Sequence, residues 1–219
     1  MSHDLLIKQL IKLTQMKKLY FILSISGLAA LTACTDHEIV PPPVPLVDLN
    51  CECDAMINDS SVTYVDSCSY SSEKTIVSGG ISNARYQTRI WTEGIPGGLE
   101  IEIRSLNWSD DGSNNPSLDE WKSFFTDNTT PGYSGGVSHN GIYVEWTDLN
   151  GNIWKSDTAA SVCVENFIFN TLIQESDTTG KYMQFDATFD CTLLNSDYGV
   201  IDSIKCLENA HVRSAFRLE

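Results

Sequence analysis

The sequence predicts a mainly β protein: an antiparallel β-sandwich or flattened barrel with one short helix, stapled by disulfides. Three observations support this. Short stretches of alternating apolar and polar residues recur through residues 50–219, helical spacing is confined to one segment, and six cysteines lie in the same region. About 170 residues suffice for one domain with a sizeable core.

The first segment is apolar and follows a basic start. Met16-Lys17-Lys18 precedes the apolar residues 19–30, and small residues lead to Leu31-Thr32-Ala33-Cys34. This order is typical of a secretory signal peptide, and the apolar part is shorter than the roughly 20 residues that span a membrane. We therefore predict that residues 1–33 are a signal peptide and that translation starts at Met16. A long amino-terminal region is the alternative.

Leu31-Thr32-Ala33-Cys34 resembles the lipobox of bacterial lipoproteins. The resemblance implies cleavage before Cys34, diacylglycerol on its thiol and an acyl chain on its amine. Several chains anchor a protein stably, because each buried CH₂ contributes roughly 0.8 kcal/mol. We therefore expect a lipid-anchored protein of the cell envelope, with the outer membrane as the favoured site. Its periplasmic and surface faces stay open as alternatives.

Residues 34–49 are predicted to form the lipidated cysteine and a tether. Four of the seven prolines lie within residues 41–45, and such a run forms an extended spacer of about 3.1 Å per residue. Asp36 and Glu38 resemble the surface-export signals of Bacteroidota lipoproteins, with a solvated linker as the alternative. Residues 50–219 follow as the β-sandwich domain.

The charge balance excludes one class of partner. Removal of residues 1–33 takes four lysines and Asp4 from 14 basic and 29 acidic residues, which changes the net charge from −15 to −18. Nucleic-acid binding depends on phosphate neutralisation by Lys and Arg, so we expect no nucleic-acid partner. The excess of acid favours solubility outside the cell.

The cysteines other than Cys34 predict three disulfides in an oxidising compartment; they are Cys51, Cys53, Cys68, Cys163, Cys191 and Cys206. Their spacing does not suit a zinc site. Folding strands 182–193 and 200–206 about Tyr198-Gly199 places Cys191 opposite Cys206, so we predict a Cys191–Cys206 disulfide. Cys163 would then pair with Cys51, Cys53 or Cys68.

The alternating pattern and the turn residues predict the remaining strands. They span residues 75–81, 84–91, 99–108, 141–147, 153–156, 164–174 and 212–218. One helix interrupts them, with Ser117 as N-cap and Glu120 completing a capping box. Leu118, Trp121, Phe124 and Phe125 form one apolar face, which we expect to plug an open end of the sandwich.

Asp148-Leu149-Asn150-Gly151 is predicted to be the turn of a hairpin. A type I turn with Gly151 as a left-handed bulge would place Trp146 opposite Trp154, whereas a two-residue type I′ turn would separate them. A facing pair could stack a sugar ring, so Trp146 and Trp154 are the candidate ligand contacts. Paired buried tryptophans are the alternative.

Several of these features together resemble uncharacterised Bacteroidota lipoproteins with a β-sandwich domain. They are the lipobox, the proline tether, the capped helix near Trp121, the Trp146-Thr147-Asp148…Gly151…Trp154 hairpin and the carboxy-terminal hairpin. The resemblance covers most of the chain, and the lipobox is its sharpest motif. It implies a fold and no catalytic residues.

Motifs for catalysis and metal binding are weak. Gly132-Tyr133-Ser134-Gly135-Gly136 matches G-x-S-x-G, but a nucleophile elbow needs a preceding strand and a following helix, and a strand follows here. The domain's two histidines, His139 and His211, form no zinc motif. The oxygen-rich residues 110–115 favour a solvated turn, with calcium as the alternative. No cofactor is predicted.

Three short motifs resemble the acceptor of Bacteroidota O-glycosylation. They are Asp157-Thr158-Ala159, Asp177-Thr178-Thr179 and Asp202-Ser203-Ile204. The second is favoured because it lies in a predicted turn.

We therefore expect a non-enzymatic envelope protein that binds a carbohydrate, a peptide or a partner protein. The alternatives are an envelope glycan hydrolase with paired carboxylates and a structural component of an outer-membrane surface complex.

Overall fold

Alternating apolar and polar residues give this domain its strands, as the computed structural model shows. The model describes residues 45–134, 140–156, 162–195 and 204–218, so Cys34, the signal peptide and most of the tether lie outside it. The strands are β1 (Glu52–Ile57), β2 (Ser60–Val65), β3 (Ser67–Thr75), β4 (Ile81–Trp91), β5 (Gly98–Ser109), β6 (Gly141–Thr147), β7 (Ile153–Ser156), β8 (Asn166–Ser176), β9 (Lys181–Leu194) and β10 (Ile204–Arg217). The helix of the described part is α2 (Leu118–Thr126).

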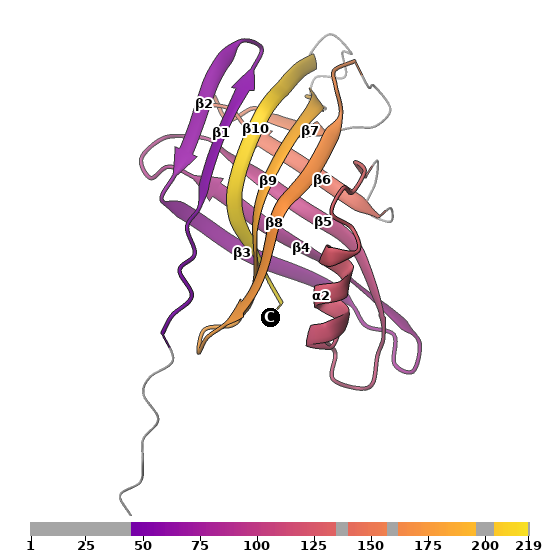
Figure 1. Ribbon diagram of the computed structural model, residues 1–219. Coiled ribbons are helices and arrows are strands. Elements are labelled where there is room, and N and C mark those ends of the chain that lie inside the picture. Colours follow the sequence, from indigo (N-terminus) through magenta and orange to yellow (C-terminus); the bar gives the residue numbers. More distant parts are fainter. Residues whose placement is uncertain (1–44, 135–139, 157–161, 196–203, 219) are drawn as a thin grey trace, which may run out of the picture. The chain divides into compact units, whose positions relative to one another are not determined.

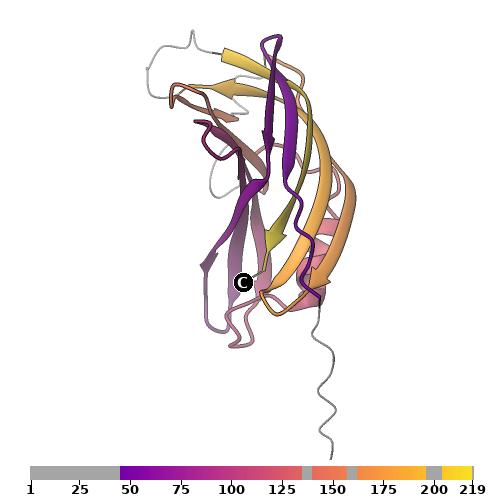
Figure 2. The same ribbon diagram turned by 90° about the vertical axis from the view of Figure 1, so that its left-hand side faces the viewer.

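All described strands belong to one antiparallel sheet. Its order is β2-β1-β10-β9-β7-β6-β5-β4-β3, and β8 pairs with β9 beside this path. The sheet curls into a half-barrel, so that β8, β9 and β10 form one curved layer and β3, β4 and β5 face it (Figures 1 and 2). The predicted mainly β, disulfide-stapled fold is confirmed.

The two end strands of this sheet are neighbours in sequence. Only Asp66 separates β2 from β3, and its left-handed backbone (φ 72°) turns the chain from one end of the sheet to the other. The Asp66 amide donates to the Cys51 carbonyl at 3.2 Å. A disulfide between Cys51 and Cys68 fixes the same corner. Bends of this kind let one chain pass between the layers of a sandwich.

The helix fills the place where the sheet divides. β9 pairs along the same edge with β8 at Lys181–Asp190 and with β7 at Leu193 and Leu194. The helix α2 lies between the two branches of the sheet, where it contacts β5 and β8 (Figure 1). The capping box of Ser117 and Glu120 is confirmed, and Trp121 and Phe125 are fully buried.

Aromatic rings join the helix to both layers. Phe125 stacks on Phe216 of β10 at 5.4 Å between ring centres, and Phe216 stacks on Phe185 of β9 at 4.9 Å. Trp121 lies edge-on to Tyr86 of β4. Because these rings come from opposite layers, the predicted apolar face of the helix holds the open side of the half-barrel together.

The bounds of some predicted strands match the structure, and those of others do not. The predicted bounds 141–147 and 153–156 match β6 and β7. The strand predicted for 75–81 is wrong, because β3 ends at Thr75 and the Gly80 amide donates to the Val77 carbonyl in a turn. β1 and β2 were missed. The strands predicted for 200–206 and 212–218 belong to one long strand, β10, over their described residues 204–206 and 212–217.

The predicted Cys191–Cys206 disulfide is wrong by one residue of register. In the pairing of β9 with β10, Thr192 lies opposite Cys206 and Cys191 lies opposite Leu207. Side chains alternate between the faces of a strand, so a shift of one residue moves Cys206 to the face that Cys191 does not share. Cys206 instead forms a disulfide with Cys163.

The prediction of three disulfides is therefore also wrong. The described structure has two, Cys51–Cys68 and Cys163–Cys206, and leaves Cys53 and Cys191 as buried thiols. Burial raises the pKa of the Cys53 thiol to about 12 and raises that of Cys191 as well. Both thiols are thus protonated at neutral pH and behave as small apolar side chains.

Candidate functional site

Of the two arrangements of the tryptophans that the sequence left open, the facing pair is the one observed. Trp146 of β6 lies directly opposite Trp154 of β7, with 6.3 Å between ring centres. Gly151 has the left-handed backbone of the bulge (φ 84°), and its amide donates to the Asp148 carbonyl at 3.0 Å. Since the turn closes in this register, both indoles point to the inner face of the sheet.

Both rings are buried rather than presented as an open shelf. Trp146 is 6% exposed and Trp154 is 8% exposed. The Trp146 indole donates to the Tyr64 hydroxyl at 2.8 Å, and the Trp154 indole donates to an Asp148 carboxylate oxygen at 3.2 Å. The pair is therefore held in place, and the buried arrangement that the sequence left as the alternative is the one observed.

A lysine ammonium covers the indole pair. The Nζ atom of Lys205, at the start of β10, lies 4.6 Å from the Trp154 ring centre and 5.5 Å from that of Trp146. Lys205 faces inward because it lies opposite Leu193, a core residue of β9. The register that places Cys206 on the outer face thus also places Lys205 over the tryptophans.

Beside this contact the domain has a hollow of about 450 Å³, which we name the tryptophan hollow. Its walls come from β2, the loop before β5, the β6–β7 turn and the start of β10. The residues that give it its character are Val62, Tyr64, Ile95, Trp146, Asp148, Leu149 and Lys205. Leu149 and Ile95 are 65% and 47% exposed, so the rim offers apolar surface to solvent.

Asp148 and Tyr64, two polar side chains of the hollow, differ in their charge. Burial alone would raise the pKa of Asp148, but hydrogen bonds from Asn152, Trp154 and Asn150 together hold it below its usual value. Its carboxylate accepts from the amides of Asn150 and Asn152, the Asn152 side chain and the Trp154 indole. Burial raises the pKa of the Tyr64 phenol, which is therefore neutral at physiological pH.

Gly97 lets the loop before β5 pack against this region. Its backbone has φ 101°, and a Cβ at this position would lie 2.5 Å from the Thr147 carbonyl oxygen and 3.3 Å from the Tyr64 hydroxyl. A side chain would therefore be strained and would push against fixed atoms. Glycine at this position therefore lets the loop lie close to Thr147 and Tyr64.

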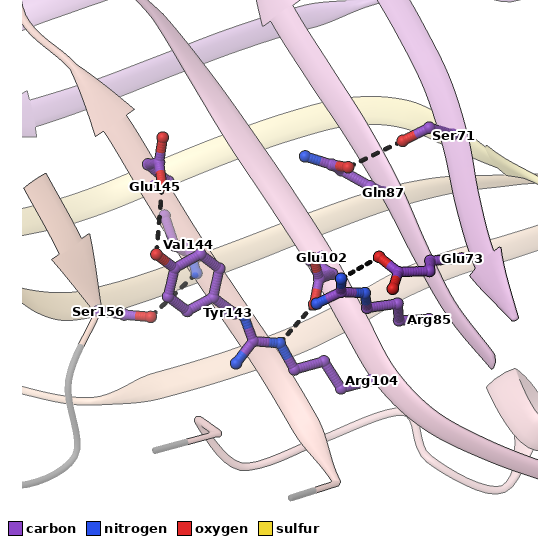
Figure 3. A network of polar contacts seen from close by, with 10 residues as sticks. All are labelled: Ser71, Glu73, Arg85, Gln87, Glu102, Arg104, Tyr143, Val144, Glu145 and Ser156. Atoms are coloured by element: carbon purple, nitrogen blue, oxygen red, sulfur yellow. Dashed lines mark hydrogen bonds and ion pairs between the residues drawn. The ribbon is translucent and has the colours of Figure 1, made fainter. Parts of the chain in front are cut away.

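The outer face of β3–β6 carries a second, polar cluster (Figure 3). Arg85 pairs with Glu73 and lies 3.8 Å from Glu102, which also pairs with Arg104. The Arg104 guanidinium lies 4.1 Å from the centre of the Tyr143 ring. Glu102 and Arg104 are each 6% exposed, although they lie on the face opposite the core. These contacts compensate the buried charges of Glu102 and Arg104.

Two carboxylates meet on the same face. Glu100 of β5 lies directly opposite Glu145 of β6, and the Tyr143 hydroxyl donates to Glu145 at 3.2 Å. Burial, and then the Glu145 charge, raise the pKa of Glu100. Opposed carboxylates are the arrangement that the hydrolase alternative requires.

The remaining sequence motifs lie outside the tryptophan hollow and outside the polar face of β3–β6. Ser134 is buried and its amide donates to the Ile142 carbonyl at 2.8 Å, and the residues that follow it, 135–139, lie outside the described part of the chain. His211 contacts Asp186 at 2.9 Å. In the oxygen-rich loop, Asp110 and Asp111 accept from loop amides. Within the described ranges no group of three or more His, Cys, Asp or Glu side chains is arranged to hold a metal ion.

The O-glycosylation motifs are only partly described. Asp177 accepts hydrogen bonds from Thr179 and from the amide of Val47, and Thr178 is exposed. Asp157-Thr158-Ala159, Asp202-Ser203, His139 and Gly135-Gly136 lie outside the described residues, as does Cys34.

Tyr64 and Lys205 were missed by reasoning from sequence. Val62 and Tyr64 alternate with polar residues, which is a strand signal, but the run is short and carries no turn motif that fixes its partner. The predicted pairing of Cys191 with Cys206 implies an outward-facing Lys205, since neighbouring residues of a strand point to opposite faces. The position of Lys205 depends on the β9–β10 register, which alternation alone leaves uncertain by one residue.

No protein-family model, curated protein or solved structure matches this chain. Across the part of the chain that the structure describes, no helix is long and apolar enough to span a membrane.

Proposed function

We propose that the chain is a lipid-anchored protein of the cell envelope that binds a ligand in the tryptophan hollow. One observation carries the binding proposal: a hollow of about 450 Å³ combines an aromatic wall, an apolar rim and an ammonium group. Ligand sites are typically concave and largely apolar, with a few fixed polar groups and volumes of roughly 300–1,000 Å³.

The rigidity of the walls supports the same proposal. Tyr64 and Trp146 are joined by a hydrogen bond of 2.8 Å, and Asp148 closes the β6–β7 turn through several donors. A preformed site loses little conformational entropy when a ligand binds. A carbohydrate, a peptide or a segment of a partner protein could enter from the rim, where Leu149 and Ile95 are exposed.

A matched pair of rim variants tests the binding proposal. Leu149→Glu places a carboxylate at the mouth of the hollow, and Ile81→Glu makes the same change at an equally exposed site outside it, since both residues are 65% exposed. Glycan and peptide libraries would be screened against the wild type. We expect ligands whose binding is lost in Leu149→Glu and kept in Ile81→Glu. Equal binding by both variants to every ligand found would contradict the proposal.

The envelope location depends on Cys34. We expect the protein to incorporate labelled palmitate and to fractionate with membranes, and Cys34→Ser to lose both properties. A wild-type protein without label would contradict lipid anchoring and would leave the hollow unaffected.

Glycan hydrolysis is the second candidate, favoured by the opposed Glu100 and Glu145. Residues directly opposite across antiparallel strands present neighbouring side chains on the same face, and retaining glycosidases act through two neighbouring carboxyl groups. The acid would be Glu100, whose pKa is raised. Turnover of fluorogenic glycosides that Glu100→Gln and Glu145→Gln each abolish would support this candidate. Turnover unchanged in both variants would contradict it.

A further inference from the structure

We propose that the tryptophan hollow takes a ligand with one negative charge on an apolar body, and that Lys205 moves from the indoles to pair with this charge. This inference rests on the proposed binding function and specifies its ligand class. The motivating juxtaposition is Lys205 over Trp146 and Trp154 at the edge of the hollow.

Lys205 differs in its partners from the three arginines that form ion pairs. Arg85, Arg104 and Arg213 each pair with a carboxylate. No carboxylate of the described residues lies within ion-pair distance of Lys205, whose contacts are the two indole rings. The ammonium is therefore available to an anion that arrives from outside.

Asp148, the acid that lines the hollow, does not form an ion pair with Lys205. Asp148 lines the hollow, but its oxygens accept from the Asn150 and Asn152 amides, the Asn152 side chain and the Trp154 indole. These four donors hold the carboxylate in the turn and offset its charge. The Asp148 oxygens are thus engaged within the turn, and Lys205 is the cation that lines the hollow.

An anion can displace the indoles as the partner of Lys205. A charge-assisted hydrogen bond between an ammonium and a carboxylate is stronger than an ammonium contact with an aromatic face. The long, flexible lysine side chain lets Nζ move without a change in β10. A neutral ligand offers no such exchange, so an anionic ligand is preferred over a neutral one of the same shape.

Movement of the Lys205 ammonium also exposes indole surface, against which the apolar part of the ligand can pack. In the structure the Lys205 ammonium lies over the indole faces, and Trp146 is only 6% exposed. Once Nζ turns toward the anion, part of the indole surface opens to the hollow. An aromatic or aliphatic group can then pack between the rings and the apolar residues Val62, Ile95 and Leu149. The ligand class is therefore an aryl or alkyl carboxylate.

A matched pair of probes tests the charge requirement on the full chain. The probes are 4-phenylbutyrate and 4-phenylbutyramide, which share their apolar body and differ in charge. Titration calorimetry would give both affinities. We expect the acid to bind about tenfold more tightly than the amide, because a hydrogen bond to a charged group is worth that much or more.

Three variants assign that preference to Lys205. In Lys205→Met the acid should bind no better than the amide, and in Lys205→Arg the preference should persist. Lys155→Met is the control, since Lys155 follows Trp154 on β7 and points to the opposite face, opposite Glu145. It should leave both affinities unchanged.

The outcomes separate this inference from the binding proposal. If acid and amide bind equally and Leu149→Glu abolishes both, the hollow binds ligands and the charge inference is wrong. An acid preference that survives in Lys205→Met also overturns the inference. If neither probe binds at millimolar concentration, the ligand class is wrong, and the library screen with the rim variants decides the binding proposal separately.

Discussion

Lys205 lies directly opposite Leu193 in the antiparallel pairing of β9 with β10. This register turns Lys205 toward the core face and Cys206 toward the outer face, where Cys163 reaches it. A shift of one residue would exchange the two faces. The position of the ammonium over the tryptophans and the choice of disulfide partner thus have the same origin.

The first prediction concerns the free thiols. Cys53 and Cys191 are each 1% exposed, and burial raises the pKa of both. We expect neither to react with iodoacetamide in the native protein and both to react after denaturation without reductant. Mass spectrometry of the alkylated peptides would identify them and separate them from Cys34. Finding Cys191 linked to Cys206 would contradict the structure.

The second prediction concerns the two disulfides. They close segments of 17 and 43 residues, and loop entropy gives stabilisations of about 3 and about 4 kcal/mol for these lengths. We expect Cys163→Ser with Cys206→Ser to lower the free energy of unfolding by more than Cys51→Ser with Cys68→Ser. Chemical denaturation would measure both losses. Unchanged stability in either double variant would contradict the assigned pairing.

The third prediction concerns the helix. Phe125 of α2 is fully buried and stacks on Phe216 of β10. Phe125→Ala should therefore lower the free energy of unfolding by about 3–5 kcal/mol. Ser117→Ala removes the N-cap hydroxyl that accepts from the Glu120 amide at 3.2 Å, and should cost about 1 kcal/mol. Lys122→Ala, on the exposed face, is the control. A Phe125→Ala loss no larger than this control would show that α2 does not brace the half-barrel.

The sequence predicted the elements whose local signals are complete. The N-cap at Ser117 and Glu120, and the turn at Asp148 to Gly151, each contain the residues that specify their own geometry. The pairing of Trp146 with Trp154 follows from that turn. These features could therefore be predicted without knowledge of the rest of the fold.

Features that depend on distant pairing could not be predicted. The Cys163–Cys206 disulfide and the inward side chain of Lys205 both require the β9–β10 register, which no short turn motif fixes. Tyr64 reaches Trp146 only because β2 and β3 occupy the two ends of the curled sheet. Local periodicity carries no information about such closure.

The fourth prediction concerns pH. Burial and the Glu145 charge raise the pKa of Glu100 in the folded protein above the unfolded value of about 4.3. The folded state therefore binds this proton more tightly, so stability falls as pH rises from the unfolded value through the folded pKa. Glu100→Gln should be more stable than the wild type at pH 7, and the difference should shrink toward pH 4 and below.

Denaturation at pH 7 and at pH 3.5 would measure this effect. Glu93→Gln, which removes a carboxylate from the exposed loop before β5, is the matched control. A Glu100→Gln variant less stable than the wild type at pH 7 would contradict the unfavourable Glu100–Glu145 pair.

Binding in the tryptophan hollow is tested most directly through the indole N–H signals of the protein in solution. The chain has five tryptophans, and only Trp146 and Trp154 lie beneath Lys205. In a ¹⁵N-labelled sample titrated with 4-phenylbutyrate or a ligand from the library screen, we predict shifts of these two indole signals, with those of Trp91, Trp108 and Trp121 unchanged. Ligand binding that leaves the Trp146 and Trp154 signals unshifted would contradict binding in the tryptophan hollow.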